Sequence, residues 1–119
     1  MQTVVLDTNA LLMPFEFKLN LDIELRRLLG EFQAFVPGCV IGELKRSHSK
    51  HASVALTLAR KYPVAESPTQ GDAGVIEVAK RLDAFVVTND ANMRAKLREQ
   101  RMKTIFLRSG NHLAIDGDY

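Results

Sequence analysis

Short apolar runs without internal polar residues constrain the fold of this chain most strongly. Residues 3–6 and 84–88 are the two clearest runs, and residues 34–36 and 104–107 are briefer ones of the same kind. Strands with one exposed face alternate apolar and polar residues, whereas strands covered on both faces read as continuous apolar runs. The runs therefore predict strands of a parallel sheet with helices on both faces.

Amphipathic segments between those runs predict the helices. We expect helices over residues 21–32, 40–46, 52–61, 72–82 and 91–101, and a short strand near Val64. Asn20 and Gly30 are typical of the beginning and end of the first of these helices. Strands that alternate with helices indicate an open, doubly wound α/β fold, in which ligands bind beyond the carboxyl ends of the strands.

The composition describes one ordinary globular domain. The chain has 119 residues, 46% hydrophobic and 25% charged, which is enough for one core, so we expect a single domain over residues 1–119. No apolar run approaches the roughly 20 residues of a membrane span, and the first residues lack the pattern of a secretory signal. We expect no membrane association and a cytoplasmic location. Cys39 is the only cysteine, which excludes an internal disulfide and a multi-cysteine zinc site.

Two of the apolar runs end in an aspartate motif. Residues 4–6 lead into Asp7-Thr8-Asn9, and residues 86–87 lead into Thr88-Asn89-Asp90. A single such aspartate is typical of a helix cap, but two at strand ends favour a shared site. Further acids lie at Glu43, within a predicted helix, and at Asp72, which begins one.

These four acids suit the hydrolysis of a phosphodiester. The reaction requires neutralisation of phosphate charge and activation of water, and a divalent metal does both. Mg²⁺ prefers a few carboxylates from separate elements, so the site is expected to hold Mg²⁺ or Mn²⁺. Carboxylates brought together without metal repel one another, which predicts perturbed pKa values. The net charge of +2 includes these acids, so the remaining surface is more basic and suits nucleic acid.

The order of these motifs resembles the PIN-domain nuclease family over nearly the whole chain. The resemblance implies a Rossmann-like, mostly parallel sheet of about five strands. It also implies a metal-dependent endoribonuclease whose catalytic and metal-binding residues are Asp7, Glu43, Asp72 and Asp90. Candidate substrate contacts next to these acids are Thr8, Asn9, Thr88, Asn89 and Asn92. Residues 11–17 resemble archaeal PIN proteins akin to nucleases that process ribosomal RNA, and VapC-type toxin ribonucleases are similar in pattern.

Two positions depart from the pattern of many PIN sequences. Ala73 stands where many carry a second aspartate, and Asn92 stands where many carry another acid. Alanine cannot ligate a metal, and asparagine offers an oxygen without charge, so we expect one well-held ion rather than two. The same departures favour the alternative function, a non-catalytic PIN-like module that binds RNA or protein.

Basic side chains close to the motifs are candidate phosphate contacts. Arg94, Arg98 and Arg101 recur at helical spacing after Asp90, while Lys45 and Arg46 follow Glu43. The arginine group is equally consistent with an exposed helix face, and the sequence does not show whether both groups border one groove. The histidines are weaker candidates for a functional role. His48 and His51 lack a third metal ligand nearby and are expected to be solvated or to contact phosphate. His112 is expected to lie in a polar tail.

Residues 11–17, Leu-Leu-Met-Pro-Phe-Glu-Phe, carry more apolar surface than one short loop easily buries. Pro14 is expected to interrupt regular structure there. One interpretation is a homodimer interface formed with the first long helix, and the other is that the segment folds under the core. Beyond RNA and a second copy, we expect an antitoxin or a ribosome-assembly protein as a partner.

Other classes fit less well. A receiver domain would carry acidic neighbours after its first strand and a lysine at a later strand end, and a HAD-like phosphatase needs Asp-x-Asp where this chain has residues 7–9, Asp-Thr-Asn. The chain also lacks the G-x-S-x-G pattern of a nucleophilic serine.

Overall fold

A computed structural model describes residues 1–116 of the chain. The strands are β1 (Gln2–Leu6), β2 (Phe32–Pro37), β3 (Val64–Ala65), β4 (Phe85–Val87), β5 (Thr104–Arg108) and β6 (His112–Asp116). The helices are α1 (Thr8–Phe17), α2 (Leu21–Leu29), α3 (Gly38–Arg46), α4 (Ala52–Ala59), α5 (Gly71–Leu82) and α6 (Ala91–Glu99).

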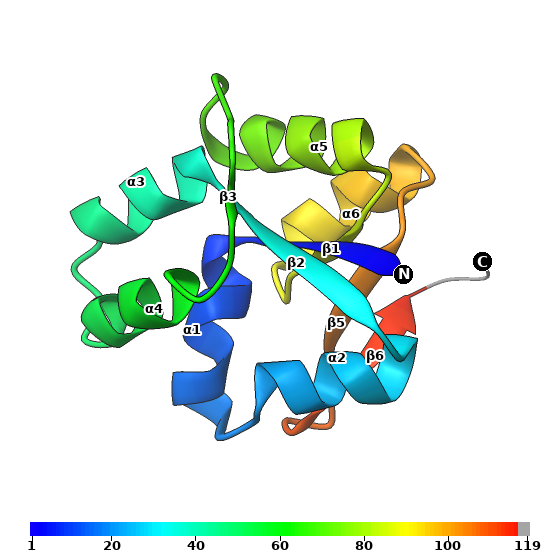
Figure 1. Ribbon diagram of the computed structural model, residues 1–119, viewed down its shortest axis with the longest axis horizontal. Coiled ribbons are helices and arrows are strands. Elements are labelled where there is room, and N and C mark those ends of the chain that lie inside the picture. Colours follow the sequence, from blue (N-terminus) through cyan, green and yellow to red (C-terminus); the bar gives the residue numbers. More distant parts are fainter. Residues whose placement is uncertain (117–119) are drawn as a thin grey trace.

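The described strands form one sheet in the order β3-β2-β1-β4-β5-β6, and all neighbours are parallel except β5 and β6. Helices α5 and α6 lie on one face, and α1 and α2 lie on the other (Figure 1). The central strands are buried on both faces: Val4, Val5, Val86 and Val87 are fully buried. These features confirm the doubly wound, mostly parallel α/β fold.

The order of the strands reverses between β1 and β4. From β1 the chain steps outward to β2 and β3, and it then returns to place β4 on the other side of β1. Leu6, the last residue of β1, pairs with Val87, the last residue of β4. Both strands therefore end at the same level, and the residues that follow them emerge together at the topological switch point, where ligands bind in folds of this kind.

The sixth strand was not expected. Strand β6 pairs antiparallel with β5 through a turn in which Ser109 and Gly110 have positive φ angles. The expectation that His112 lies in a polar tail is therefore wrong, because His112 begins this strand. Glu24 of α2 secures β6, since its carboxylate accepts a hydrogen bond from the backbone N–H of Leu113 at 2.8 Å.

For residues 11–17, the expectation that Pro14 interrupts regular structure is wrong, whereas the interpretation that the segment folds under the core agrees with the burial of Leu11 and Met13. The segment belongs to α1, which continues through Pro14 although proline removes one helical hydrogen bond at a cost of about 3 kcal/mol. Leu11 and Met13 are buried beneath the sheet, and such side chains contribute roughly 1.5–3 kcal/mol each, which offsets the proline. The amphipathic burial of α1 therefore outweighs the local penalty.

The remaining expected elements agree with the structure within a few residues. The first long helix ends at Leu29 rather than at residue 32, because Gly30 ends it with a positive φ and Phe32 already belongs to β2. The short strand expected near Val64 is β3. Within residues 1–116, the structure holds no helix with the length and apolar character needed to cross a membrane.

Candidate carboxylate site

A cavity of about 220 Å³ opens at the switch point of the sheet. Its walls come from the ends of β1 and β4, from α1 and α3, and from the beginning of α5. The lining residues are Asp7, Thr8, Asn9, Leu12, Glu43, Gly71, Asp72, Val75 and Asp90. The fold thus brings all four predicted acids to one cavity, together with two of the expected substrate contacts.

Asp7 is the most buried acid of the cavity, with 7% of its surface exposed. Its Oδ1 atom caps α1 by accepting a hydrogen bond from the backbone N–H of Ala10 at 2.8 Å. The pKa of Asp7 is raised to about 7, mainly by burial and in smaller part by the charges of Asp72 and Asp90, against hydrogen bonds from Thr88 and Ala10 that lower it. The expected pKa perturbation is confirmed for Asp7, although burial contributes more than repulsion between acids.

Asp90 lies in the segment between β4 and α6 and caps the helix that follows, as Asp7 does after β1. Its Oδ1 atom caps α6 by accepting hydrogen bonds from the backbone N–H groups of Asn92 at 2.8 Å and Met93 at 3.3 Å. Thr88, which is fully buried, links the two aspartates: its hydroxyl bonds to Asp7 and accepts from the backbone N–H of Asp90 at 3.2 Å. Both aspartates are therefore helix caps and cavity acids at once, because each cap uses one carboxylate oxygen.

Two other contacts hold the cavity walls together. The hydroxyl of Thr8 donates a hydrogen bond to the Glu43 carboxylate and so joins α1 to α3. The Oδ1 atom of Asn9 accepts from the backbone N–H of Asn89 at 2.7 Å, which joins the segments that follow β1 and β4. Thr8 and Asn9 line the cavity as expected, but their side-chain oxygens are already engaged within the protein.

Asp72 lies in the first turn of α5, where Gln70 is the cap. Its Oδ2 atom is 3.1 Å from the ammonium nitrogen of Lys96, which reaches across from α6. Asp72 is therefore not the cap of α5, and its carboxylate forms an ion pair with Lys96 instead.

The chemistry of these residues fits Mg²⁺ or Mn²⁺. Carboxylate oxygens are the hard ligands that both ions prefer, and a cation in the cavity would relieve the buried Asp7 carboxylate of its unfavourable surroundings. In the described arrangement of residues 1–116, no three His, Cys, Asp or Glu side chains are grouped closely enough to hold one ion. Glu43 and Asp72 are turned to Thr8 and Lys96 instead, so metal binding requires these side chains to change partners.

The expected basic stripe on α6 is not gathered at the cavity. Arg94 and Arg98 form ion pairs with Asp116 of β6, at 3.4 and 2.9 Å, and the Arg94 guanidinium lies 3.9 Å from the centre of the Phe106 ring. These arginines attach α6 to the β5–β6 hairpin. Their expected role in binding phosphate has no support from this arrangement, because both pair with Asp116 of a strand that the sequence pattern did not reveal.

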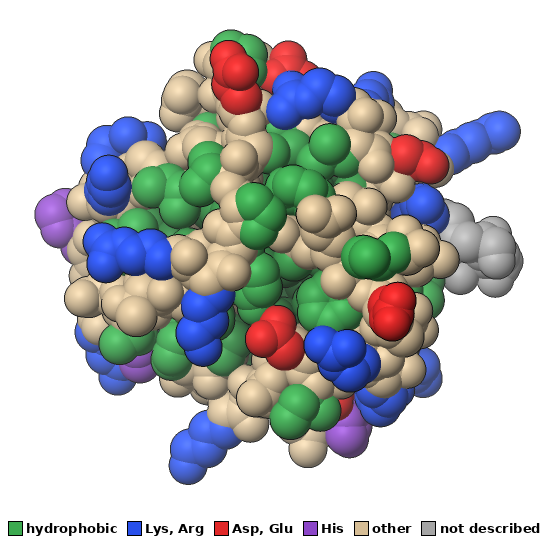
Figure 2. Space-filling model, viewed as in Figure 1, with side chains coloured by type: hydrophobic (Ala, Val, Ile, Leu, Met, Phe, Trp, Pro, Cys, Tyr) green, Lys and Arg blue, Asp and Glu red, His purple; other side chains and the backbone are tan. Residues whose placement is uncertain are grey.

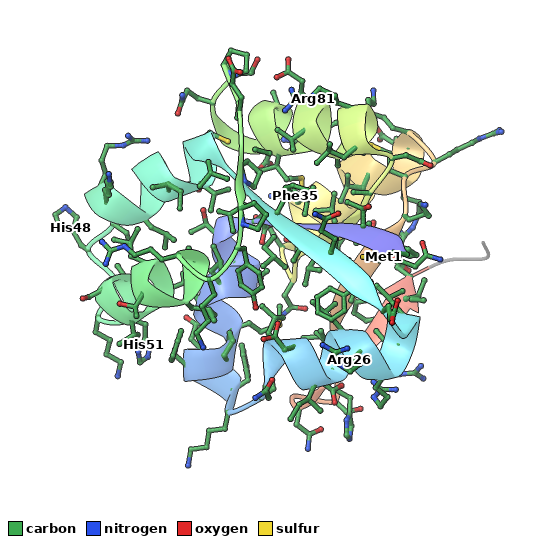
Figure 3. The ribbon with its side chains drawn as sticks, viewed as in Figure 1. Met1, Arg26, Phe35, His48, His51 and Arg81 are labelled. Carbon is green, nitrogen blue, oxygen red and sulfur yellow. The ribbon has the colours of Figure 1, made fainter. Side chains whose placement is uncertain are left out.

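The other predicted substrate contacts are not among the residues that line the cavity. Lys45 and Arg46 are exposed on the last turn of α3, two and three residues after Glu43. Asn92 is exposed on the first turn of α6, and its backbone serves the Asp90 cap. His51 lies at the start of α4, where its ring stacks on Phe15, while His48 points outward from the α3–α4 connection (Figure 3). The two histidines do not form a shared metal site.

Several residues of the site were not among the site residues predicted from the sequence. Leu12 and Val75 supply apolar walls, Gly71 begins α5 with a positive φ, and Lys96 pairs with Asp72. Lys96 could have been singled out, because it lies one helical turn beyond Asn92 on the helix that Asp90 caps. Asp116 carried no such signal, since its role depends on the pairing of β6.

The fold and cavity define an α/β domain with an acidic site at the switch point of its sheet. A family model described as a PIN like domain matches residues 4–110, so the chain belongs to the PIN-like domain family. The chain is also similar to the structure of the PIN domain endonuclease Utp24, with a TM-score of 0.83, 19% identity and coverage of 96% of this chain and 90% of that one. A domain of a functionally unknown Methanocaldococcus jannaschii protein aligns with a TM-score of 0.66 and 16% identity, covering 100% of this chain and 96% of that one.

Two curated relatives are similar over nearly their full length. Ribonuclease VapC4 of Methanocaldococcus jannaschii is 26% identical, and the alignment covers 98% of each chain. Ribonuclease VapC9 of Archaeoglobus fulgidus is 24% identical, with 94% of this chain and 87% of the relative covered.

Proposed function

We propose that this protein is a metal-dependent endoribonuclease that hydrolyses RNA phosphodiester bonds at the carboxylate cavity. The observation that carries the proposal is the buried Asp7 carboxylate, which shares one cavity with Glu43, Asp72 and Asp90. Burying a carboxylate next to other acids is unfavourable for folding, and such an arrangement is typical of a functional site. The names of the relatives, two ribonucleases and an endonuclease, agree with this function.

Mg²⁺ or Mn²⁺ would be held by Asp7 and Asp90, with Glu43 and Asp72 acting directly or through water. Such an ion supplies the charge that neutralises the phosphate and makes water more acidic. The protein's own contribution is orientation: the capping bonds from Ala10 and Asn92 fix the Oδ1 atom of each aspartate. Because these bonds are to backbone groups, the two carboxylates are held in place before any ligand binds.

The RNA is expected to approach over the outer end of α3. Lys45, Arg46, His48 and Lys50 follow Glu43 closely in the chain and are exposed. Figure 2 shows Lys and Arg side chains gathered on the left of the molecule, where α3 and α4 lie, beside His48 (labelled in Figure 3). Basic side chains next to an acidic cavity would hold phosphates on either side of the bond that is cut.

The test is cleavage of structured and single-stranded RNA with Mg²⁺, Mn²⁺ or excess chelator. Asp7→Asn should abolish metal-dependent cleavage, because it removes an anionic ligand while asparagine still caps α1. Asp83→Asn is the matched control: Asp83 is exposed at the end of α5, away from the cavity lining, and its positive φ suits asparagine. Its cleavage should equal that of the wild-type protein.

Asp90→Asn is expected to behave like Asp7→Asn. RNA that binds but stays intact at every metal concentration would contradict the proposal and favour the non-catalytic module. Cleavage that persists in both variants would show that the site is assigned wrongly. The choice between toxin and RNA-processing roles, and between an antitoxin and a ribosome-assembly partner, stays a prediction.

A further inference from the structure

Lys96 is the basic residue most directly placed against the acidic cavity. Among the ion pairs within residues 1–116, only the pair between Lys96 and Asp72 involves an acid that lines the cavity. The distance between its Nζ and Oδ2 atoms is 3.1 Å. The other ion pairs involve Glu24, Asp83 and Asp116, which do not line the cavity.

The pair does little to hold the fold together. Both side chains are about half exposed, 53% for Lys96 and 42% for Asp72, and exposed ion pairs contribute little to stability. A lysine side chain is a flexible stem with a compact charge, so the ammonium group leaves one partner for another readily. The position of this charge therefore matters more than the strength of the pair.

The ammonium group of Lys96 lies where the site has few acidic side chains. Ala73 follows Asp72 without a carboxylate, and Asn92, one turn before Lys96 on α6, is neutral. A second dication close to the first would need more negative charge than these residues supply. A single positive charge at Asp72 requires less negative charge around it, because it repels a nearby dication half as strongly as a second dication would.

We propose that Lys96 is a cationic residue of the nuclease site that competes with the divalent ion for Asp72 and contacts the RNA phosphate once the ion has displaced it. This inference rests on the proposed function. In the metal-free protein the ammonium group offsets the charge of Asp72. After the ion binds, the released ammonium group lies at the rim of the cavity, where a phosphate of the substrate would replace the carboxylate as its partner.

The first measurement is calorimetry of the metal-free protein with Mn²⁺. Lys96→Gln should bind Mn²⁺ about threefold more tightly than the wild type, because a competing and repelling charge is gone. Lys96→Arg keeps the charge and should match the wild type. Lys80→Gln removes the same charge from the far end of α5, outside the cavity, and should leave the affinity unchanged.

The second measurement is cleavage of a short RNA at saturating Mn²⁺. Lys96→Gln should cut about tenfold more slowly, the loss expected for one charged hydrogen bond to phosphate, and Lys80→Gln should cut at the wild-type rate. Tighter metal binding together with slower cleavage is a signature that structural damage cannot produce, because damage to the site weakens both. Thermal unfolding of each variant checks that the fold is retained.

An unchanged or weaker affinity for Mn²⁺ in Lys96→Gln would overturn the inference while leaving the nuclease function intact. Tighter Mn²⁺ binding with an unchanged rate would overturn the contact with phosphate. A wild-type protein that binds Mn²⁺ and cuts no RNA would instead overturn the proposed function, and the competition at Asp72 would still be decided by the calorimetry.

Discussion

The hydroxyl of Thr88 hydrogen bonds to the carboxylate of Asp7, although 80 residues of chain separate the two positions. The contact follows from the register of the sheet, because Leu6 pairs with Val87. Asp7 directly follows Leu6, and Thr88 directly follows Val87. The same hydroxyl accepts from the backbone N–H of Asp90. One buried threonine therefore fixes the relative position of the two aspartates that would hold the metal.

Replacing Thr88 with valine should disturb both aspartates. The change preserves shape but removes two hydrogen bonds in a fully buried position, and we expect the free energy of unfolding to fall by about 2 kcal/mol. The pKa of Asp7 should rise further, since the bond from Thr88 lowers it. Urea unfolding at several pH values measures both effects. Thr88→Ser keeps the hydroxyl and should preserve the pKa of Asp7, so equal shifts in both variants would contradict this role.

The stability of the metal-free protein should depend on pH through Asp7. Folding raises the pKa of this carboxyl from 3.8 to about 7, so the folded state binds the proton more tightly than the unfolded state. This contribution to stability is fully present at low pH and is lost as the pH rises from about 4 to about 7. The loss is on the order of 4 kcal/mol.

Asp7→Asn isolates that contribution. With chelator present, the stability of this variant relative to wild type should increase between pH 4 and pH 7 and then level off, because asparagine does not ionise. Chemical unfolding across this range measures the difference. Parallel pH profiles for the two proteins would show that the Asp7 pKa is not raised in the folded state.

Gly74 in α5 allows the close approach of α3 and of the segment that precedes α5. A Cβ atom at this position would lie 2.2 Å from the carbonyl oxygen of Thr69 and 2.8 Å from the sulfur of Cys39. Gly74→Ala should therefore destabilise the protein by about 3 kcal/mol, as overpacking of a core does. It should also weaken metal binding, because Asp72 follows closely after Thr69, whose backbone must move.

Gly42 provides the matched control for Gly74. It also lies within a helix, but a Cβ atom there meets first the flexible end of Arg46, at 3.2 Å. Alanine favours helices over glycine by roughly 0.5–1 kcal/mol, so Gly42→Ala should leave the stability unchanged or raise it. Thermal unfolding of both variants compares them. Equal destabilisation would mean that the close packing at Gly74 is not the cause.

The second half of α1 is where we predict contact with a second copy of the chain. Leu11 and Met13 are buried in the core, which leaves Phe15 and Phe17 exposed to 36% and 41%. Phe15 borders a hollow of about 390 Å³ between α1, α2 and α4, and Figure 2 shows hydrophobic side chains in the hollow between α4 and α2. Exposed aromatic surface of this kind favours association.

Light scattering at micromolar concentration should give twice the mass of one 13.3 kDa chain. Phe17→Ser should shift the protein toward the monomer, because it removes apolar contact area. Ile115→Ser is the control: Ile115 is similarly exposed, at 38%, but lies on β6 and should leave the mass unchanged. A monomeric wild-type protein would show that this surface serves another purpose.

The amino-acid sequence by itself determined most of the helices and strands of this fold, and it singled out the four acids that line the cavity. Strands that are buried on both faces are continuous apolar runs, so residues 4–6 and 85–87 can be recognised as strands from the sequence. A parallel sheet then places the polar residues that follow such strands at one edge. Helical periodicity similarly indicated α2, α5 and α6. These signals are local, because each depends on residues within one or two turns or one strand.

Only the tertiary structure decided which distant partners those residues meet. Arg94 and Arg98 form a basic stripe in the sequence, but pairing of β6 with β5 brings Asp116 against them. Lys96 shares their helix and reaches Asp72 instead. Pro14 would end an isolated helix, yet burial of Leu11 and Met13 carries α1 through it. Strand pairing and core packing join residues far apart in the chain, and no local pattern of side chains encodes which of them will meet.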